Sequence, residues 1–365
     1  EGVVDMGRHK NDYIFAPDKK RSDNRGCIFI VLALLLAVVA TALLVNAAGN
    51  EKLELRSEKI AVMGLDKSYE GFTVLHLSDL HAAAVGSDLE IWRKMLFGKS
   101  YQAVVMSGDM VGQTGEFEPL LSLIHTLKQI NAAAPIYLIA GDDDPSPILA
   151  TPRGTPEVLA DWVLAAVKAG AIYLDAPVRQ EVGKKAVWFV PEYLYDVDAA
   201  GMLGSLQKQK ESMETLGQQY EAEGAANYRA LGYRIDTMER TLAALKIMLS
   251  TDLQMAVSHA PLSADYIRTS IEWANQDAVF NFRNIDLLFA GHYCAGQWRL
   301  PMLGAIYVPD HGWFPPDDGI VGMQRVNSVN QYISGGLGAS DYYPMKGRLL
   351  NTPSISLLTM TGRIK

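Results

Sequence analysis

The chain has 365 residues, of which 49% are hydrophobic and 20% charged, and its formal net charge at pH 7 is −8. This composition indicates a globular protein with a large apolar core, and it excludes a disordered or collagen-like chain. The acidic balance provides no global basic field, so we expect no nucleic acid partner. With only Cys27 and Cys294 present, a disulfide framework is not expected.

The amino-terminal segment has the pattern of a membrane anchor. Residues 1–26 form a polar tail that is rich in Lys and Arg, and residues 27–47 form the predicted transmembrane helix. From Cys27 to Val45 there are 19 uncharged residues, and a helix of that length is about 28 Å long, enough to cross a bilayer core. By the positive-inside rule the tail is cytoplasmic and the large domain lies outside the cell. The competing interpretation is a cleaved signal peptide, but the long apolar run favours an uncleaved single-pass anchor in the cell membrane.

Residues 53–365 show the alternation of an α/β layered domain. An edge strand is expected at 53–63. Apolar residues at helical spacing predict helices at 88–97, 116–130 and 155–169, each between strand-like runs. Further strands are expected at 171–174, 186–190, 305–308, 331–334 and 354–360.

Residues 199–250 break this alternation and predict a helical hairpin inserted between two strands. Two sets of apolar residues recur there at helical spacing, and Gly224 lies between the sets. One interpretation is that these apolar stripes only pack on the domain. The other is that the hairpin acts as a lid, a lipid-facing arm or a surface for a protein partner, because long insertions beside a site are often functional.

Five strand-like apolar runs each end in a side chain that can bind metal. In chain order these side chains are Asp79 and His81, Asp109, the carboxylates that follow Gly141, His259, and finally His292 with Cys294. Ligand sites in open α/β sheets gather beyond the carboxyl ends of the strands. The pattern therefore predicts a metal centre at one edge of the domain.

The series resembles the calcineurin-like metallophosphoesterase family, which reads D-x-H, G-D, G-N-H, a lone H and G-H-x-H. The resemblance covers about residues 71–358 apart from the insertion. The segments AGHYCAGQWRLP, AIYVPDHGWF and ISGGLGAS are similar to the bacterial membrane-associated branch, which includes enzymes that cleave UDP-2,3-diacylglucosamine. The resemblance implies a four-layer α/β/β/α sandwich. It also implies two divalent metal ions (Mn, Fe or Zn) that bind a phosphoryl group and activate hydroxide.

Carried over by motif, the resemblance also assigns the ligands. Asp79, His81 and Cys294 would hold one ion, and Asp109 would bridge both ions. Asp142, His259 and His292 would hold the second ion.

Three positions depart from the family pattern. Asp142 replaces Asn, which keeps an oxygen ligand and adds negative charge. Asp143 replaces the catalytic His, and a carboxylate beside two cations is a poor acid at neutral pH, although it can orient water or bind another cation. Cys294 replaces the last His, which retunes the site toward softer metals such as Zn or Fe or removes one ion.

Two functions follow from these residues. The first is a membrane-anchored, metal-dependent phosphoesterase that hydrolyses a phosphodiester, pyrophosphate or phosphomonoester, with a lipid or cell-envelope precursor as one candidate substrate. The second is a catalytically impaired protein of the same fold that binds a metal or, through residues 199–250, a partner. Asp143 and Cys294 favour the second function.

Several other polar residues are weaker candidates. His76 lies inside a strand and is expected in the core, and His125 is expected on a helix surface. His311 lies in a Gly- and Pro-rich loop that would form the rim of the site. Asp317 and Asp318 are interpreted as a solvated turn, and the glycines at 335–338 as a close backbone turn rather than a phosphate loop.

Overall fold

The computed structural model describes residues 2, 25–50, 52–83, 88–149, 157–220, 222–275 and 277–362. The chain divides into two compact units, Glu1–Val45 and Asn46–Lys365. Nearly all of the expected basic tail, residues 1–26, lies outside the described residues.

The first unit contains most of helix α1 (Arg25–Asn50). Within this helix the 20-residue stretch Ile28–Ala47 is long and apolar enough to cross a membrane, and it is not buried in the protein. A signal sequence near an amino terminus can meet the same criterion of length and hydropathy. The helix is thus compatible with both interpretations of the sequence.

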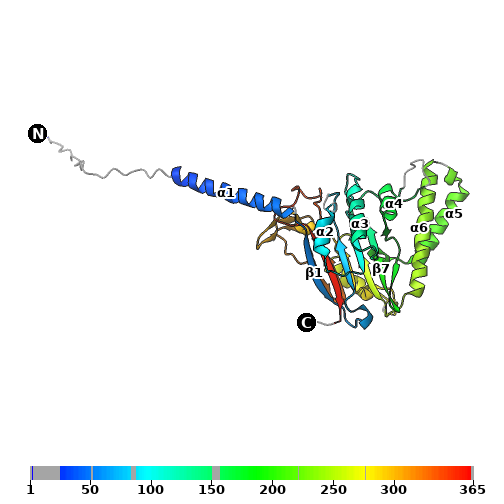
Figure 1. The fold of residues 1–365 in the computed structure, drawn as a ribbon. Helices are drawn as coiled ribbons and strands as arrows, with labels where there is room; N and C mark the ends of the chain where they lie inside the picture. The colour runs from blue at the N-terminus through cyan, green and yellow to red at the C-terminus, as the bar shows by residue number, and fades with distance from the viewer. Residues whose placement is uncertain are drawn as a thin grey trace. The chain divides into compact units, whose positions relative to one another are not determined.

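The second unit is built on two six-stranded sheets (Figure 1). In the first sheet the order is β1 (Glu54–Ala61), β16 (Ser354–Thr361), β2 (Thr73–Leu77), β3 (Ala103–Ser107), β4 (Ile136–Ile139) and β5 (Ala171–Tyr173). Strands β2 to β5 are parallel, and β16 runs antiparallel to β2. Because β2, β3 and β4 are buried along their whole length, they appear in the sequence as continuous apolar runs.

The second sheet has the order β14 (Gly322–Val326), β15 (Val329–Ile333), β9 (Leu287–Ala290), β8 (Leu253–Val257), β7 (Lys185–Pro191) and β6 (Val178–Val182). Its four central strands are parallel, and the edge strands β14 and β6 are antiparallel to their neighbours. Two short pairs lie outside both sheets, β10 (Arg299–Leu300) with β11 (Gly304–Ala305) and β12 (Tyr307–Val308) with β13 (Gly312–Trp313).

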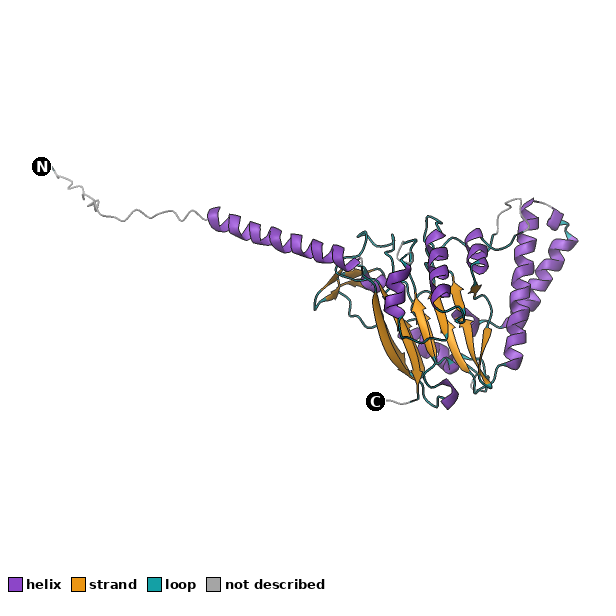
Figure 2. Cartoon of the chain, in the orientation of Figure 1, coloured by secondary structure: helices purple, strands orange, loops and turns teal. Residues whose placement is uncertain are grey.

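The two sheets pack face to face, and helices cover both outer faces (Figure 2). Between the sheets the ring of Tyr137 stacks on that of Phe189, with centroids 4.1 Å apart. The first sheet is covered by α2 (Leu89–Leu96), α3 (Glu118–Ile130) and α4 (Asp161–Lys168). The second sheet is covered by α5 (Ala199–Thr215), α6 (Ala222–Ile247) and α7 (Ala264–Trp273). This arrangement confirms the predicted four-layer α/β/β/α class.

The expected helical hairpin is present as α5 and α6, which pack on each other and on Trp188 and its neighbours in β7. The break between the helices does not fall at Gly224, which lies inside α6. Instead α5 ends before Gly217, whose φ of 69° leaves the helical region, and a single 3-10 turn, η4 (Gln218–Tyr220), leads into α6.

Two expected elements are wrong in their bounds. The helix expected at 155–169 begins only at Asp161, because Leu159 pairs with Ile148 in an isolated bridge and Ala160 is extended, with a ψ of 153°. The strand expected at 305–308 is divided between β11 and β12, which pair with different partners. The strands β6 and β14 and the helix α7 were not expected. Helix α7 has a sequence signal, because the Ser263 hydroxyl accepts a hydrogen bond from the Tyr266 backbone N–H and caps the helix.

Asp286 joins two central strands and makes the stability of the fold dependent on pH. Its carboxylate accepts a hydrogen bond from the Gln254 backbone N–H at 2.8 Å. Burial nevertheless raises the pKa of Asp286 to about 7. Because the folded state binds the Asp286 proton more tightly than the unfolded state does, the protonated carboxyl group stabilises the fold. This stabilisation is complete below the unfolded pKa of about 4 and is lost as pH rises through about 7.

We therefore expect the free energy of unfolding of the wild type, relative to Asp286→Asn, to fall between pH 4 and pH 7. The slope is at most about 1.4 kcal/mol per pH unit. Unfolding followed by circular dichroism across this range measures it, with the exposed Asp318→Asn as the control for removal of one carboxylate. A wild-type-to-variant difference that does not change with pH would contradict this role of Asp286.

Candidate metal centre

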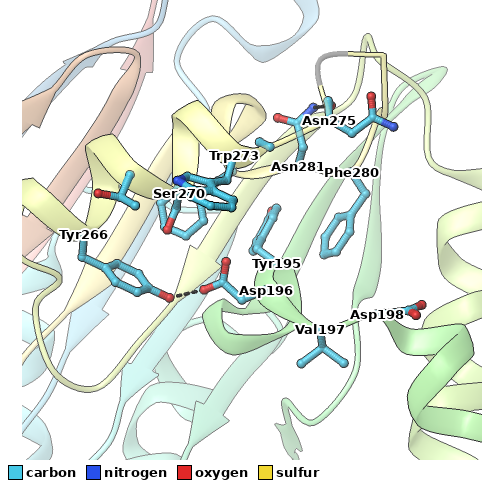
Figure 3. Close-up of a pocket in the computed structure, with 13 residues that line it drawn as sticks. Tyr195, Asp196, Val197, Asp198, Tyr266, Ser270, Trp273, Asn275, Phe280 and Asn281 are labelled. Carbon is cyan, nitrogen blue, oxygen red and sulfur yellow. Dashed lines mark hydrogen bonds between the residues drawn. The ribbon is translucent and has the colours of Figure 1, made fainter.

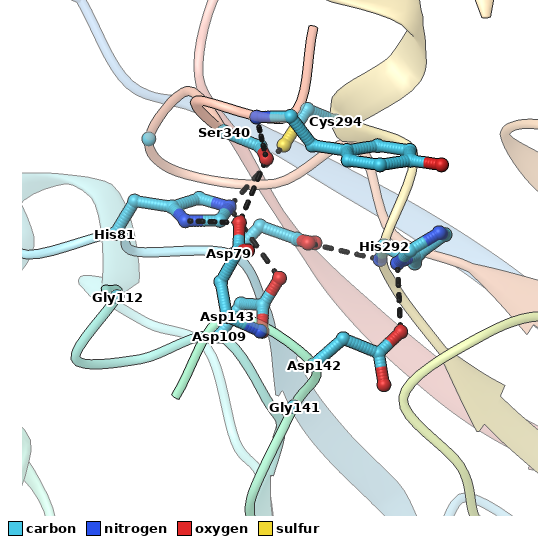
Figure 4. Close-up of polar contacts among 12 residues, drawn as sticks. Asp79, His81, Asp109, Gly112, Gly141, Asp142, Asp143, His292, Cys294 and Ser340 are labelled. Atoms are coloured by element: carbon cyan, nitrogen blue, oxygen red, sulfur yellow. Dashed lines mark hydrogen bonds and ion pairs between the residues drawn. The ribbon is translucent and has the colours of Figure 1, made fainter. Parts of the chain in front are cut away.

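Polar side chains from both sheets meet just beyond the carboxyl ends of five parallel strands. Strands β2, β3 and β4 of the first sheet lead to Asp79, Asp109 and Asp142, and strands β8 and β9 of the second sheet lead to His259 and His292. Figure 4 shows most of these side chains pointing toward one another from separate loops. The strand ends that the sequence singled out are thus together in space.

Three groups of side chains offer atoms that lie within 4.8 Å of one another, as a metal ion requires. The first group is Asp79, His81 and Cys294, and the second is Asp109, His259 and His292. The third consists of His81, Asp109 and Asp143, so Asp109 and His81 each belong to two groups. The first group has the three side chains that the motifs assign to one ion, and the second has Asp109, His259 and His292 of the other set but lacks Asp142.

Asp109 is at the centre of the cluster. Its Oδ2 lies 3.0 Å from His259 Nε2 and 3.6 Å from His81 Nε2. Its Oδ1 accepts a hydrogen bond from the Asp143 backbone N–H at 2.8 Å. The ring of His259 is oriented by its other nitrogen, because Nδ1 lies 2.9 Å from the Ser107 carbonyl oxygen. If Nδ1 carries the proton and donates it to this carbonyl, Nε2 keeps its lone pair for a metal.

The backbone at the cluster is unusual for residues with side chains. Asp79, His81, Asp109, His292 and Cys294 all have φ between 45° and 77°. This left-handed region is uncommon for residues other than glycine and costs on the order of 1–3 kcal/mol each, and such residues concentrate at functional sites. Five of the seven predicted metal ligands are held in this way.

The glycines that precede the carboxylates are explained by close packing. A Cβ on Gly141 would lie 2.2 Å from Asp109 Oδ1, and a Cβ on Gly108, whose φ is 94°, would lie 2.6 Å from His259 Nδ1. Any larger residue would displace these side chains. The G-D pairs of the sequence are therefore required by the contacts between neighbouring loops.

The centre is a buried site with strong electrostatic coupling. Asp79 and Asp109 are almost completely buried. Burial raises the pKa of Asp79, which neighbouring histidines only partly offset. Burial acts against ionisation of Asp109 as well, but the hydrogen bond from His259 prevails and lowers its pKa. Although burial by itself disfavours the charged ring of His259, the hydrogen bond with Asp109 raises its pKa to about 10.

Asp142 lies at the edge of the cluster. Its side chain is 69% exposed, and its Oδ2 lies 3.4 Å from His292 Nδ1. It belongs to none of the three close groups among the described residues. Of the predicted ligands, Asp142 is the one that this structure does not bring into the cluster.

Asp143 is held firmly on both sides. Its Oδ1 accepts a hydrogen bond from Gln113 Nε2 at 2.8 Å. Its Oδ2 accepts one from the Ser340 hydroxyl, also at 2.8 Å (Figure 4). Its Oδ2 also lies 3.6 Å from His81 Nδ1. With both oxygens already accepting hydrogen bonds, Asp143 is arranged as an anionic acceptor rather than as a proton donor.

Cys294 lies at the bottom of the site and is completely buried. Its Sγ is 3.9 Å from His81 Nε2. Burial, reinforced by the charge of Asp79, raises the pKa of the Cys294 thiol well above its usual range. A nearby cation would be needed to ionise it, and a metal ion deprotonates a coordinating thiol.

Two residues that the sequence analysis did not single out support the cluster. Asp144 accepts hydrogen bonds from the backbone N–H groups of Val111 at 2.7 Å, Gly112 at 3.1 Å and Gly141 at 2.9 Å, which ties the loop after β3 to the loop after β4. The buried Arg348 donates to the carbonyl oxygens of Gly335, Gly338 and Asn351. Asp144 was visible in the run of three carboxylates, but nothing local in the sequence marks Arg348.

The weaker candidates fall mostly where they were expected. His76 is buried between the sheets, 2.8 Å from the Ser107 hydroxyl, and burial lowers its pKa to about 3. His125 is exposed on α3. His311 packs against Tyr293, which packs against His292, so it reaches the rim through one ring. Asp317 lies in an exposed turn and also pairs with Arg299 at 2.6 Å. Gly338 N–H donates to the Asp79 carbonyl oxygen at 2.6 Å, which confirms a close backbone turn.

The chemistry of the side chains fits divalent metal ions. Carboxylate oxygens, imidazole nitrogens and one thiol are the ligands that Mn, Fe and Zn prefer. A cavity of about 290 Å³ leads to the cluster and is lined by the carboxylates of Asp109, Asp142, Asp143 and Asp310, with His292 as the one basic side chain. Asp109 is the buried carboxylate of the four, and nearby positive charge would stabilise its ionised form.

Comparison with known proteins gives only distant similarity. No family model and no curated protein matches the sequence. Among solved structures, the phosphopantetheinyl hydrolase from Mycobacterium tuberculosis is similar at a TM-score of 0.35 and 13% identity, over 74% of this chain and 91% of that chain. GAP50, the anchor in the inner membrane complex of Plasmodium, gives 0.30 and 11%, over 77% and 76%. The purple acid phosphatase PPD1 from yellow lupin seeds gives 0.32 and 9%, over 79% and 54%.

Asp144→Ala should loosen the centre without removing any predicted ligand. Four backbone N–H groups, those of Met110, Val111, Gly112 and Gly141, would lose their acceptor, and each buried donor left unpaired costs about 1–3 kcal/mol. We expect the free energy of unfolding to fall by at least about 2 kcal/mol and the affinity for Mn or Zn to fall by about 10-fold or more. Calorimetric metal titration and thermal unfolding measure both effects, with Asp318→Ala as the control. Unchanged metal affinity in a folded Asp144→Ala protein would show that this carboxylate does not position the site.

Proposed function

We propose that this chain is a metal-dependent phosphoesterase that hydrolyses a phosphodiester, pyrophosphate or phosphomonoester. The observation that carries the proposal is the pair of ligand groups that lie side by side at the strand ends. Asp79, His81 and Cys294 form one group, and Asp109, His259 and His292 form the other, so that Asp109 faces both. Two adjacent ligand sets joined by a shared carboxylate are the arrangement of a two-metal phosphoryl transfer site.

The charge of the entrance supports the same conclusion. The cavity over the centre is lined by four carboxylates, and a phosphate anion would be repelled from it. Binding of phosphate there requires divalent cations. When bound, such ions would polarise the phosphoryl oxygens and lower the pKa of water.

The residues of this chain would then have separate tasks. Asp109, together with His81 and His259 opposite it, would bind the divalent cations and fix their position. Asp79 accepts a hydrogen bond from the His292 backbone N–H at 2.9 Å and so fixes the loop that carries His292. Asp143, oriented by Gln113 and Ser340, presents a carboxylate that can accept a proton or orient water at the entrance. The carboxylate of Asp143 is better suited to substrates whose leaving group is already a stable anion.

A larger cavity beside the centre offers room for the organic part of a substrate. It has a volume of about 620 Å³, and its wall includes Asp142 and His259 of the centre. The opposite wall comes from the hairpin and includes Met202, Leu206 and Met238. A phosphoester with an apolar group, such as a lipid or cell-envelope precursor, would fit this combination.

We also propose that the chain is a single-pass membrane protein, with its amino terminus in the cytoplasm and the phosphoesterase domain outside. The apolar stretch Ile28–Ala47 and the basic residues before it in the sequence support this proposal.

The second candidate function is a protein that binds metal or a partner without turnover. Two observations favour it. Asp143 stands where an acid is expected and already accepts two hydrogen bonds, and the Cys294 thiol is completely buried. The hairpin would then provide the partner surface.

Metal content and hydrolysis, measured on the same sample, test the first function. The full chain, purified in detergent without chelator, should carry close to two metal ions and cleave bis-nitrophenyl phosphate or nitrophenyl phosphate when Mn, Zn or Fe is supplied. His259→Asn should lose hydrolysis by about 100-fold or more, because it removes a ligand. His125→Asn, the matched change of an exposed histidine, should have no effect.

A double variant separates the two functions. Asp143→His combined with Cys294→His restores the residues of the resembled family. If the wild type and the double variant both turn over, the chain is an enzyme with a modified site. If only the double variant does so, the native chain is a binding protein.

A further inference from the structure

A third cavity lies between α7 and the segment that leads from β7 to α5 (Figure 3). It has a volume of about 490 Å³ and shares no lining residue with the metal centre. Its walls come from three places: the end of the 3-10 helix η3 (Glu192–Asp196) with the two residues that follow, one side of α7 with the two residues after it, and residues 280–282. None of the functions proposed above uses this cavity.

Aromatic rings form much of its lining. Tyr195 stacks on Phe280 with ring centroids 4.2 Å apart, and Tyr266 meets Phe282 edge to face at 6.0 Å. Trp273 is different, because 85% of this residue is exposed at the mouth of the cavity. A large indole ring left in contact with solvent beside a cavity offers a face to a ligand.

The charge of the lining has one sign. Asp196 and Asp198 are its charged side chains, and no Lys, Arg or His lines the cavity. One oxygen of Asp196 accepts a hydrogen bond from the Tyr266 hydroxyl, which holds the carboxylate in place beside the rings (Figure 3). Asp198 caps α5 by accepting from the Gly201 backbone N–H at 3.1 Å. An anionic ligand would therefore be repelled from this cavity.

The end of α7 adds little to the negative potential, because a guanidinium group already binds there. The carboxyl terminus of a helix carries a partial negative charge, which basic residues in the last turn usually balance. The last turn of α7 contains no basic residue. Arg283 donates from Nε to the Ile271 carbonyl oxygen at 2.8 Å, but Arg283 does not line the cavity.

We propose that this cavity binds an organic ammonium ion. The faces of Trp, Tyr and Phe attract cations that carry apolar groups, above all quaternary ammonium groups, and a nearby carboxylate strengthens the attraction. Trp273 and Tyr195 provide the rings, and Asp196 provides the charge. The site is independent of the metal centre and of the phosphoesterase function.

Choline and its uncharged isostere 3,3-dimethylbutan-1-ol provide the test, because they have nearly the same shape and differ in charge. The full chain in a neutral detergent is titrated with each at constant ionic strength, followed by calorimetry and tryptophan fluorescence. Choline should bind at least 10-fold more tightly than the alcohol. Trp273→Ala and Asp196→Asn should each weaken choline binding by 10-fold or more.

Trp313→Ala is the matched control, since Trp313 is also exposed, at 68%, and lies elsewhere in the chain. It should bind choline as the wild type does. If either of the other variants fails to fold, Tyr266→Phe is measured in its place. This change keeps the ring and removes only the hydrogen bond to Asp196, so most of the choline binding should remain. Equal affinity for choline and the alcohol, or no binding of either, would overturn the proposal.

The ammonium group could belong to a free small molecule or to a lipid headgroup. Dihexanoylphosphatidylcholine carries the same group on a soluble lipid and distinguishes the two sources. Tighter binding than choline supports a lipid headgroup, and weaker binding supports a free ammonium compound.

Discussion

The buried carboxylates of Asp79 and Asp109 are the constraint on which the rest of the site depends. Both lie at the joint between two sheets, where water cannot compensate their charge. The nearest basic groups are histidines, and the buried guanidinium of Arg348 donates its hydrogen bonds to backbone carbonyl groups. The fold brings these carboxylates together at a place where bound cations would stabilise their ionised forms.

The strain in the surrounding backbone follows from the same constraint. To bring side chains from five loops to one point, the chain adopts left-handed conformations at five ligands and uses glycines where two loops touch. These conformations lower the stability of the fold, and strain of this kind is concentrated at functional sites. Asp144 and Arg348, which bind backbone groups around the cluster, offset part of that cost by fixing the loops.

The main outline of the fold and the site could be predicted from the sequence because both depend on local patterns. Buried parallel strands appear as apolar runs, and each run ends where a ligand begins, so the positions of Asp79, Asp109, His259 and His292 followed directly. The start of α4 could not be predicted, because it depends on a bridge between Leu159 and Ile148. The support by Arg348 depends on contacts with carbonyl groups of distant loops, which no sequence pattern reveals.

The three residues that depart from the resembled motifs differ in where they lie and in what they contact. The Cys294 thiol lies in one of the groups that could hold a metal ion, and a thiol favours softer metals than an imidazole does. Asp143 replaces an acid by an acceptor that is tied to Gln113 and Ser340, so it changes the chemistry at the entrance. Asp142 keeps the type of donor but lies exposed at the rim. The described geometry therefore supports the proposal of cation binding more directly than it supports proton donation to a leaving group.

The most direct test of this account is a crystal structure of the protein soaked with zinc or manganese, with data collected at the absorption edge of the metal. We expect two anomalous peaks about 3.5–4 Å apart. They should lie on either side of the Asp109 carboxylate, with one of them bonded to Cys294 Sγ. An anomalous map with no peak between these side chains would contradict the central claim that the cluster is a metal centre, whether the metal is bound elsewhere in the crystal or not at all.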